Sequence, residues 1–231
     1  MRYRILSGPE GATIDPVTGL VQWDGRVDGA VFLSPTGASN NFGDIVTPVG
    51  AEGSLALSTL TVEGWFNPQE FTAFNGAASL FRLAGPGAPE AYHVRFAGNN
   101  QLELFLDQED TGNQAVFRTP FEVELDRWYH VALVIDDASQ TFDLRVDGQS
   151  LIAGELPTSL TYTEGSRLEF GSPSNFSGLI DNFRIWNVAR TPEQLQDGLG
   201  QQFDGDPNLV LDYRFEDDGS RLVLDLSLIH I

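Results

Sequence analysis

The residues of this chain that could do acid–base chemistry are carboxylates, and one short run spaces three of them evenly. Glu122, Glu124 and Asp126 stand at positions i, i+2 and i+4, so an extended strand would carry all three on one face. Two carboxylates on one face can hydrolyse a glycosidic bond if burial raises the pKa of one of them. The run comes just before the apolar segment that begins at Trp128. We therefore interpret it as an exposed polar turn rather than a catalytic pair.

Nucleophilic and zinc chemistry have little support in the sequence. The chain has no cysteine, it has three histidines, His93, His130 and His230, and it has no Gly-x-Ser-x-Gly segment. His93 and His130 lie far apart in apparent strands, where neither a Ser-His-Asp triad nor a tetrahedral zinc site is indicated. We expect the ring of His130 to occupy an aromatic core or interface position.

The charge balance excludes one class of partner. The formal net charge is −20 at pH 7 and all 13 basic residues are arginine, so a surface broad enough to bind nucleic acid is not expected. An excess of carboxylates suits either divalent cations or simple solubility, and we favour solubility. No apolar run is long enough to span a bilayer, and the first residues, MRYRILSGPEG, lack the apolar centre of a signal peptide. If the protein is exported, we expect its signal upstream of this sequence.

Short apolar runs separated by glycine, proline, asparagine and aspartate recur along the chain, which predicts antiparallel strands. One helix is indicated, because Thr191 is a good N-cap, Pro192 suits the first helical position and Gln194 sits where a capping box needs its partner. The predicted fold class is all-β, an antiparallel jelly-roll β-sandwich with one short helix near the C-terminal end. The expected strands are Ala30–Leu33, Ile45–Thr47, Leu60–Phe66, Ser79–Leu83, Tyr92–Phe96, Leu102–Leu106, Ala115–Arg118, Trp128–Ile135, Phe142–Val146, Arg167–Phe170, Gly178–Trp186, Leu209–Phe215 and Leu222–Asp225.

Alternation within the apolar segments predicts which side chains face the core. Both faces of segments 60–66 and 128–135 are largely apolar, which is typical of central strands covered on both sides. In segment 178–186, strict alternation places Asp181 on the same face as Phe183 and Ile185. A buried carboxylate among apolar neighbours needs a partner, and the residues leave open whether that partner is a calcium ion or a backbone turn.

Five segments, in order and at similar spacing, carry a resemblance to a known family. Together they resemble the laminin-G-like, concanavalin A-like jelly-roll domains of bacterial extracellular proteins, which are related to pentraxins. The resemblance spans about residues 25–226 and implies the same sandwich fold. The segments are LTVEGWFNP at Leu60–Pro68, WYHVALVID at Trp128–Asp136, FDLRVDG at Phe142–Gly148, FSGLIDNFRIWNVAR at Phe176–Arg190 and LVLDYRFED at Leu209–Asp217.

The resemblance also implies a calcium site. Members of this family often hold calcium between an early loop that contains aspartate and the aspartate of a Gly-x-Ile-Asp-Glu segment, which correspond here to Asp44, with Asn41, and to Asp181. Asn182 stands where the family usually has glutamate, so a different or weaker ligand set is expected. Separately, the loop DQEDTGN that begins at Asp107 is dense in oxygen ligands, although it is equally typical of a solvated hairpin turn.

Sugar sites on such sandwiches pair a polar or calcium site with an exposed aromatic ring. The candidate rings here are Phe71, Phe74 and Tyr162, with Phe176 as a fourth, and Asp107 is a candidate polar group. The alternative is that each ring anchors a loop against the edge of the sandwich, because single exposed aromatic residues are common. Enzymes of similar fold carry a Glu-x-Asp-x-x-Glu motif, which the acidic run described above does not reproduce.

The sequence divides into three predicted segments. Residues 1–24 contain SGPEGATIDPVTG and either resemble part of an immunoglobulin-like repeat of bacterial surface proteins or form an N-terminal hairpin. Residues 25–226 form the laminin-G-like domain. Residues 227–231, SLIHI, resemble the read-through of a sequencing adapter in a metagenomic assembly, and we expect them to be a non-native tail.

We expect a secreted or cell-surface bacterial module that binds a ligand without catalysis, with a carbohydrate as the ligand and Ca²⁺ as the cofactor. Neighbouring domains of a larger parent protein are the expected covalent partners. Two alternatives stay open, namely a glycan hydrolase or lyase on the same fold and a structural spacer in an adhesin. The enzyme alternative has only the analogy of fold in its favour.

Overall fold

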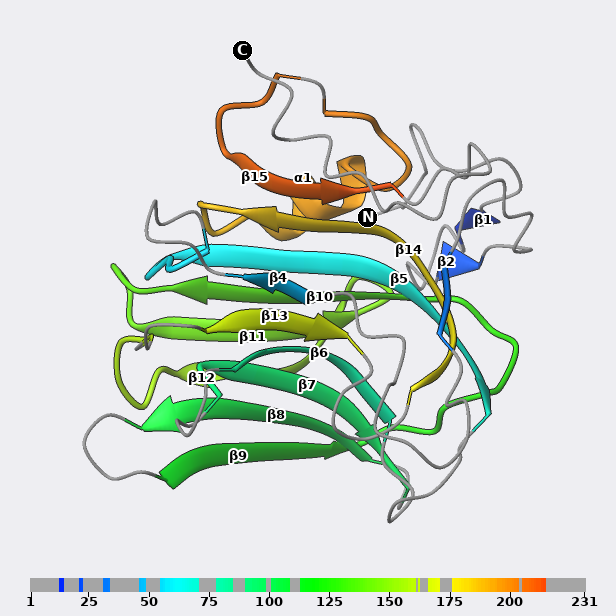
Figure 1. Ribbon diagram of the computed structural model, residues 1–231, viewed down its shortest axis with the longest axis horizontal. Coiled ribbons are helices and arrows are strands. Elements are labelled where there is room, and N and C mark those ends of the chain that lie inside the picture. The colour runs from blue at the N-terminus through cyan, green and yellow to red at the C-terminus, as the bar shows by residue number, and fades with distance from the viewer. Residues whose placement is uncertain are drawn as a thin grey trace.

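The computed structural model shows a two-layer sandwich of antiparallel strands (Figure 1). Backbone and side chains are described for residues 55–70, 78–84, 90–98, 101–107, 114–160, 162, 166–170, 176–203 and 205–214, and the backbone alone for residues 13–14, 21–22, 31–33, 46–48, 108 and 113. The elements are β1 (Thr13–Ile14), β2 (Val21–Gln22), β3 (Val31–Leu33), β4 (Val46–Pro48), β5 (Leu60–Glu70), β6 (Ala78–Ala84), β7 (Tyr92–Ala97), β8 (Gln101–Gln108), β9 (Asn113–Pro120), β10 (Tyr129–Asp136), β11 (Thr141–Val146), β12 (Gln149–Glu155), β13 (Arg167–Phe170), β14 (Ser177–Trp186), α1 (Pro192–Asp197) and β15 (Leu209–Tyr213).

Two large sheets make up the sandwich, and every described pairing in them is antiparallel. The seven-stranded sheet has the order β12-β11-β10-β5-β14-β15, with β3 also paired to β14. The six-stranded sheet has the order β4-β13-β6-β7-β8-β9. In both sheets, strands that are distant in the sequence lie side by side, as β5 does with β10 and β14. The predicted jelly-roll β-sandwich is therefore confirmed.

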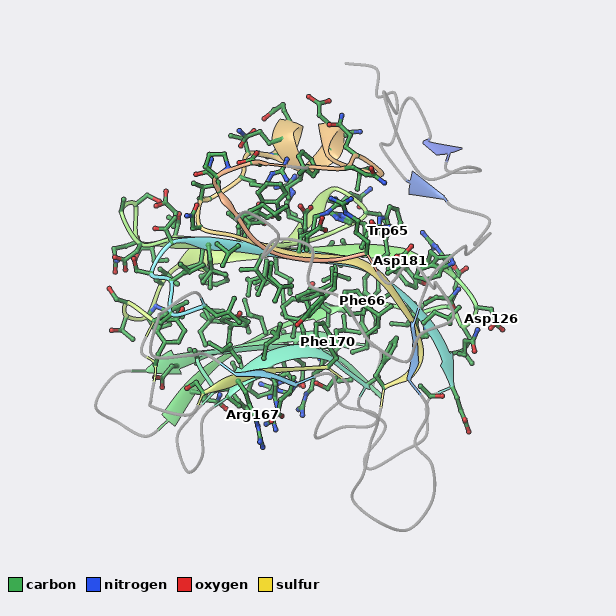
Figure 2. The ribbon with its side chains drawn as sticks, turned by 45° about the horizontal axis from the view of Figure 1, so that its top comes forward. Trp65, Phe66, Asp126, Arg167, Phe170 and Asp181 are labelled. Atoms are coloured by element: carbon green, nitrogen blue, oxygen red, sulfur yellow. The ribbon has the colours of Figure 1, made fainter. Side chains whose placement is uncertain are left out.

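The hydrophobic core lies between the two sheets. Aromatic rings from both sheets meet there, since Phe170 of β13 packs edge to face on Phe183 of β14 with 4.4 Å between the ring centroids. Figure 2 shows Phe66 and Phe170 between the two layers. Burial of such a ring stabilises the fold by about 1.5–3 kcal/mol. The inward residues of β10, as alternation predicted, are Tyr129, Val131, Leu133 and Ile135.

The predicted helix forms and lies against the outer side of the seven-stranded sheet (Figure 1). The backbone N–H of Gln194 donates to Thr191 Oγ1 over 3.2 Å, and the backbone N–H of Thr191 donates to Gln194 Oε1 over 2.9 Å, which completes the capping box. Leu195 is the buried residue of this helix. This cover explains why β5 and β10 are apolar on both faces. No helix among the described residues is long and apolar enough to cross a bilayer.

One strand of the two large sheets was not predicted, and some predictions fall where the structure describes little. The strand β12 is mostly exposed, so its sequence QSLIAGE lacks the apolar alternation that marks the central strands. It follows a two-residue hairpin turn in which Asp147 and Gly148 have φ angles of 49° and 79°, as a type I′ turn requires. In residues 1–24 the described strands β1 and β2 pair with each other, so both interpretations of that segment stay open. The predicted strand Leu222–Asp225 and the tail 227–231 lie outside the described residues.

The facing predicted for the strand β14 is wrong after its midpoint, because the strand contains a bulge. Asn182 has a φ of 46°, and the pairing with β5 shifts between Asp181 and Arg184. Asp181 pairs with Trp65 and Arg184 pairs with Glu63, so both side chains lie on the outer face of the sheet, and Figure 2 shows Asp181 beside Trp65 on that side. The residues of β14 that face the core are Ile180, Phe183 and Ile185.

Candidate functional site

The outer face of the six-stranded sheet carries a layer of charged side chains whose positions follow from strand register. In β7, Tyr92 and Val94 point into the core, so His93 and Arg95 point outward. One outward row across the sheet is Glu169, Arg82, His93, Phe105 and Val116, and the next is Ser79, Arg95, Glu103 and Arg118. We call the following group the arginine face: Arg82, Glu90, His93, Arg95, Glu103, Phe105, Val116, Arg118, Arg167 and Glu169.

Glu103 holds two arginines at one end of the arginine face. Arg95 Nε donates to Glu103 Oε2 over 2.5 Å, and Arg118 Nε donates to Glu103 Oε1 over 2.7 Å. The guanidinium of Arg95 also lies over the ring of Phe105, 4.6 Å from its centroid. Burial alone would raise the pKa of Glu103, but the hydrogen bonds from Arg118 and Arg95 and their charges lower it. Glu103 is therefore an ionised, buried anchor between two partly exposed cations.

A second carboxylate, Glu169, anchors two more arginines of the arginine face. Arg82 Nε donates to Glu169 Oε2 over 2.8 Å, and Arg167 Nε donates to Glu169 Oε1 over 2.6 Å. Arg82 Nη1 also reaches Glu90 Oε1 at 2.8 Å, and Gln114 Nε2 donates to Glu90 Oε2 over 2.6 Å. Figure 2 shows Arg167 pointing away from the core. The polar groups of this part of the face are thus held by one another in a fixed arrangement.

A serine, a histidine and a glutamate lie together on the same sheet, but they are too buried for catalysis. Ser79 Oγ lies 2.9 Å from His93 Nε2, and His93 Nδ1 lies 3.8 Å from Glu90 Oε1. That order is the one a nucleophile, a base and an orienting acid take in hydrolases. Ser79, however, has 0% of its surface exposed and His93 has 3%. Burial, assisted by the charges of Arg82 and Arg95, lowers the pKa of His93 to about 4 against the opposing charges of Glu90 and Glu103.

A polar layer between the seven-stranded sheet and the C-terminal segment has a structural role. Glu63 of β5 accepts from Trp186 Nε1 over 2.7 Å and from Arg190 Nη1 over 3.2 Å, and its Oε2 lies 3.2 Å from His130 Nε2. Burial alone would raise the pKa of Glu63, but the hydrogen bond with His130 and the charges of His130, Arg190 and Arg184 lower it to about 2. The ring of His130 thus lies at the predicted interface, beneath the helix.

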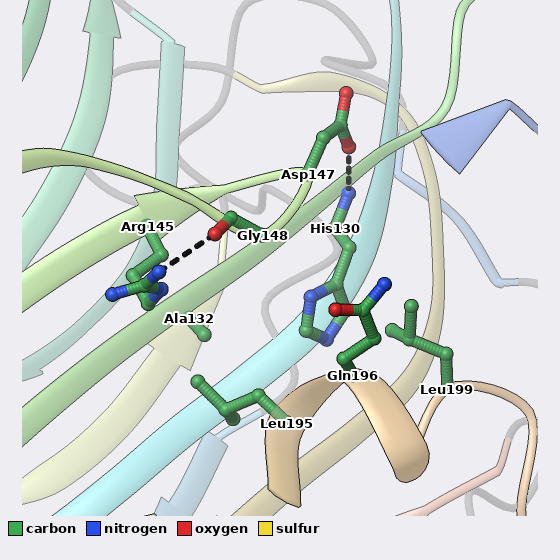
Figure 3. Close-up of a pocket in the computed structure, with 8 residues that line it drawn as sticks. All are labelled: His130, Ala132, Arg145, Asp147, Gly148, Leu195, Gln196 and Leu199. Atoms are coloured by element: carbon green, nitrogen blue, oxygen red, sulfur yellow. Dashed lines mark hydrogen bonds between the residues drawn. The ribbon is translucent and has the colours of Figure 1, made fainter. Parts of the chain in front are cut away.

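A small cavity beside this layer lies between α1 and β10. Figure 3 shows His130 on its wall, with the backbone N–H of His130 donating to Asp147 Oδ1 over 2.9 Å. Its volume of about 20 Å³ can hold one water molecule and cannot hold a sugar ring. The lining residues are His130, Ala132, Arg145, Asp147, Gly148, Leu195, Gln196 and Leu199.

Of the predicted ligand-binding residues that the structure describes, Asp107 lies beside the arginine face and Tyr162 does not. Asp107 points outward from β8 opposite Gln114, two residues beyond Phe105 on the same side of the strand. Tyr162 donates its O–H to the backbone carbonyl of Leu57 and packs partly against the core, as a loop anchor would. Phe71 and Phe74 lie outside the described residues.

The predicted calcium ligands are only partly within the described residues. Asp181 Oδ1 accepts the backbone N–H of Asn182 over 2.7 Å, so a backbone turn is one partner of this carboxylate. Asp44 and Asn41 lie outside the described residues. Within the described ranges, no three His, Asp or Glu side chains gather closely enough to hold a metal ion.

The evenly spaced acidic run before Trp128 is a turn. Glu122, Glu124 and Asp126 are all exposed, and Asp126 has a φ of 61° at the turn that leads into β10. The backbone N–H of Glu124 donates to Tyr129 Oη over 2.8 Å, which ties this turn to the strand. Figure 2 shows Asp126 at one end of the sandwich, apart from Arg167.

The arginine face itself was not predicted from the sequence. Arg95, Glu103 and Arg118 lie in three different strands, and each one reads in its own segment as an ordinary outward polar residue. The available signal was the short connection between β7 and β8, which pairs Ala97 with Gln101 and, by counting back, Arg95 with Glu103. Counting through this turn would have predicted that Arg95 and Glu103 lie together, without Arg118.

The fold defines a class, that of antiparallel jelly-roll sandwiches. The sequence matches the model of the concanavalin A-like lectin/glucanases superfamily over residues 40–196, and the chain belongs to that family. A comparison with curated proteins found no match.

Solved structures share the fold at low sequence identity. A candidate carbohydrate-binding protein from Bacteroides ovatus matches with a TM-score of 0.62 and 19% identity over 82% of this chain and 52% of its own length. A SAP-like pentraxin from Limulus polyphemus has a TM-score of 0.55 and 17% identity over 76% of this chain and 83% of its own. The CBM40 of the Ruminococcus gnavus IT-sialidase has a TM-score of 0.54 and 15% identity over 73% of this chain and 95% of its own. This chain thus spans about half of the Bacteroides protein, and these likenesses establish the fold alone.

Proposed function

We propose that this chain is a non-catalytic, glycan-binding module of an extracellular bacterial protein. The observation that carries the proposal is the arginine face, on which guanidinium and carboxylate groups are fixed by mutual hydrogen bonds beside Phe105 and Val116. Sugar hydroxyls both donate and accept hydrogen bonds, so an array of fixed donors and acceptors next to apolar side chains suits them. A rigid array also binds with a smaller loss of side-chain entropy.

The similar structures support the same proposal. One is described as a candidate carbohydrate-binding protein, and the Ruminococcus gnavus CBM40 was also solved bound to sialyllactose. The absence of catalysis is supported by two features of the described residues. The acidic turn at Glu122–Asp126 is exposed, and the Ser79 hydroxyl beside His93 is buried.

Binding to a panel of neutral and acidic polysaccharides, measured by affinity electrophoresis and calorimetry, tests the proposal. Val116→Glu places a large charged side chain in the arginine face, and Ala153→Glu introduces the same residue at an exposed position of β12 in the other sheet. We expect the wild type and Ala153→Glu to bind and Val116→Glu to lose binding. Binding that survives in Val116→Glu would move the site elsewhere, and no binding by the wild type would favour the spacer alternative.

The same panel tests the enzyme alternative. Each polysaccharide is incubated with the protein and its chain length is followed by chromatography. We expect no shortening. Shortening by the wild type that Glu124→Gln abolishes would instead identify a hydrolase or lyase that uses the acidic turn.

Calcium is the cofactor that we propose for Asp181 together with Asp44 and Asn41. The support for it is the family membership and the position of Asp181 on the outer face at the bulge of β14. Carboxylate and amide oxygens of this kind are ordinary calcium ligands. The melting experiment described in the Discussion tests this proposal independently of glycan binding.

A further inference from the structure

Arg95 and Arg118 form a paired cationic site on the arginine face. Both pair with Glu103 across neighbouring strands, so their backbones are roughly 10 Å apart with the carboxylate between them. Each contact with Glu103 uses the Nε–H. In the part of the chain that the structure describes, the terminal Nη groups of both arginines have no hydrogen-bond partner. We call Arg95, Glu103 and Arg118 the arginine fork.

The arginine fork is held in place before any ligand arrives. Glu103 is 4% exposed, while the side chains of Arg95 and Arg118 are 27% and 47% exposed. Phe105 supports Arg95 from the neighbouring row through the cation–π contact. A guanidinium that is fixed through Nε presents its remaining N–H groups in a known direction, which is the arrangement that recognises planar anions by two hydrogen bonds.

The charge of the fork differs from that of the chain around it. Two guanidiniums and one carboxylate leave one net positive charge, whereas the whole chain carries −20. In the other part of the arginine face, the charges of Arg82 and Arg167 are balanced by those of Glu90 and Glu169, so the net positive charge lies at the fork. At the other end Asp107 points outward opposite Gln114, two residues beyond Phe105 along β8, or roughly 7 Å. The face is therefore polarised along its strands.

We propose that the arginine fork binds an anionic group, a carboxylate or a sulfate, of an acidic glycan. This inference rests on the proposed glycan-binding function and names the class of glycan. A neutral glycan would leave the Nη groups of the fork without a charged partner. An anion displaces the water around these Nη groups and accepts charge-assisted hydrogen bonds from them.

Matched polymers test the inference. Polygalacturonate carries a carboxylate on each sugar, and its methyl ester has the same backbone with the charge removed. Chondroitin and chondroitin sulfate form a second pair that separates carboxylate from sulfate. We expect the wild type to bind polygalacturonate at least about tenfold more tightly than its methyl ester, and this preference to weaken with added salt. Tighter binding of chondroitin sulfate than of chondroitin would identify sulfate as the preferred group.

Single substitutions test which arginines bind the anionic group. Arg95→Gln and Arg118→Gln remove one side of the fork each. Arg127→Gln is the matched control, because Arg127 lies outside the arginine face and its side chain is 27% exposed, as is that of Arg95. Glu103 keeps one arginine partner in either fork variant, so these variants should fold, which thermal melting verifies. We expect about a tenfold or greater loss of polygalacturonate binding in the fork variants and less than about a twofold loss in the control.

The outcomes separate this inference from the proposed function. Equal binding of polygalacturonate and its ester overturns the fork while glycan binding stands. An equal loss in Arg127→Gln and Arg118→Gln also overturns the fork, because a general charge effect would then explain the binding. If the wild type binds no polysaccharide of either panel, the proposed function and the fork are both refuted.

Discussion

Replacement of Glu63 by glutamine tests whether the polar layer beneath the helix holds the sandwich together. Glu63 is 2% exposed and contacts His130, Trp186 and Arg190. A decrease of its pKa from 4.5 to about 2 corresponds to about 3 kcal/mol of stability contributed by the ionised form. Glutamine can still accept from Trp186, but it leaves the guanidinium of Arg190 without its buried counter-charge. We therefore expect Glu63→Gln to unfold about 3 kcal/mol more easily at pH 7.

The effect of Glu63→Gln on stability should also depend on pH. Because the pKa of Glu63 is lowered in the folded protein, its contribution is complete above pH 4.5 and is lost as the pH falls toward 2. The difference in stability between the wild type and Glu63→Gln should therefore narrow over that window. Urea unfolding followed by tryptophan fluorescence at several pH values measures it. Glu155→Gln, at an exposed position of β12, is the control. The reasoning is refuted if the two variants unfold alike at pH 7, or if the difference persists at pH 2.

Three further predictions concern other parts of the sandwich. Thr191→Ala removes the capping box and should lower stability by about 1 kcal/mol, seen in calorimetry as a fall of roughly 2–4 °C in Tm; an unchanged Tm would contradict it. Burial, partly opposed by the backbone of His130 and the charge of Arg127, raises the pKa of Asp147 from 3.8 to about 6. The wild type should therefore gain stability as the pH falls from 6 toward 3.8, and urea titrations should show no such gain for Asp147→Asn. Calcium at 100 times its Kd should raise Tm by roughly 5–10 °C in the wild type and leave the Tm of Asp181→Asn unchanged. A wild-type Tm that changes neither with calcium nor with a chelator would exclude the site.

The sandwich was predictable because its central strands repeat their pattern on both faces. In β10, alternate residues from Tyr129 to Ile135 fill the core, and the opposite side carries His130 and Ala132 against the helix. Burial of both faces produces a nearly continuous apolar run, which the sequence displays directly. The helix was predictable for a different reason, since Thr191 and Gln194 satisfy each other within four residues. Local chemistry and simple periodicity were enough for both elements.

The facing of Asp181 was not predictable from alternation, because one backbone angle reverses the strand. Asn182 adopts a positive φ, which asparagine tolerates better than most residues, and the inserted residue moves Phe183 rather than Asp181 into the core. Strict alternation placed Asp181 on the core face, as an acid that required an ion or a turn, whereas the structure buries it on the outer face. The bulge itself supplies a partner, since the N–H of Asn182 donates to its carboxylate. The need for calcium therefore no longer follows from burial, and it has to be tested by metal binding.

The candidate binding face illustrates a limit of a different kind, because no single segment contains it. Arg95 belongs to β7, Glu103 to β8 and Arg118 to β9, and their meeting depends on register across two connections. Counting through the short turn between β7 and β8 pairs the first two residues, but an error of one residue in the next connection would turn Arg118 toward the core. Such an error would bury a guanidinium among Leu102 and its neighbours, at a cost of several kcal/mol. The cost of burying that charge therefore selects the register in which both arginines lie outward on the same carboxylate.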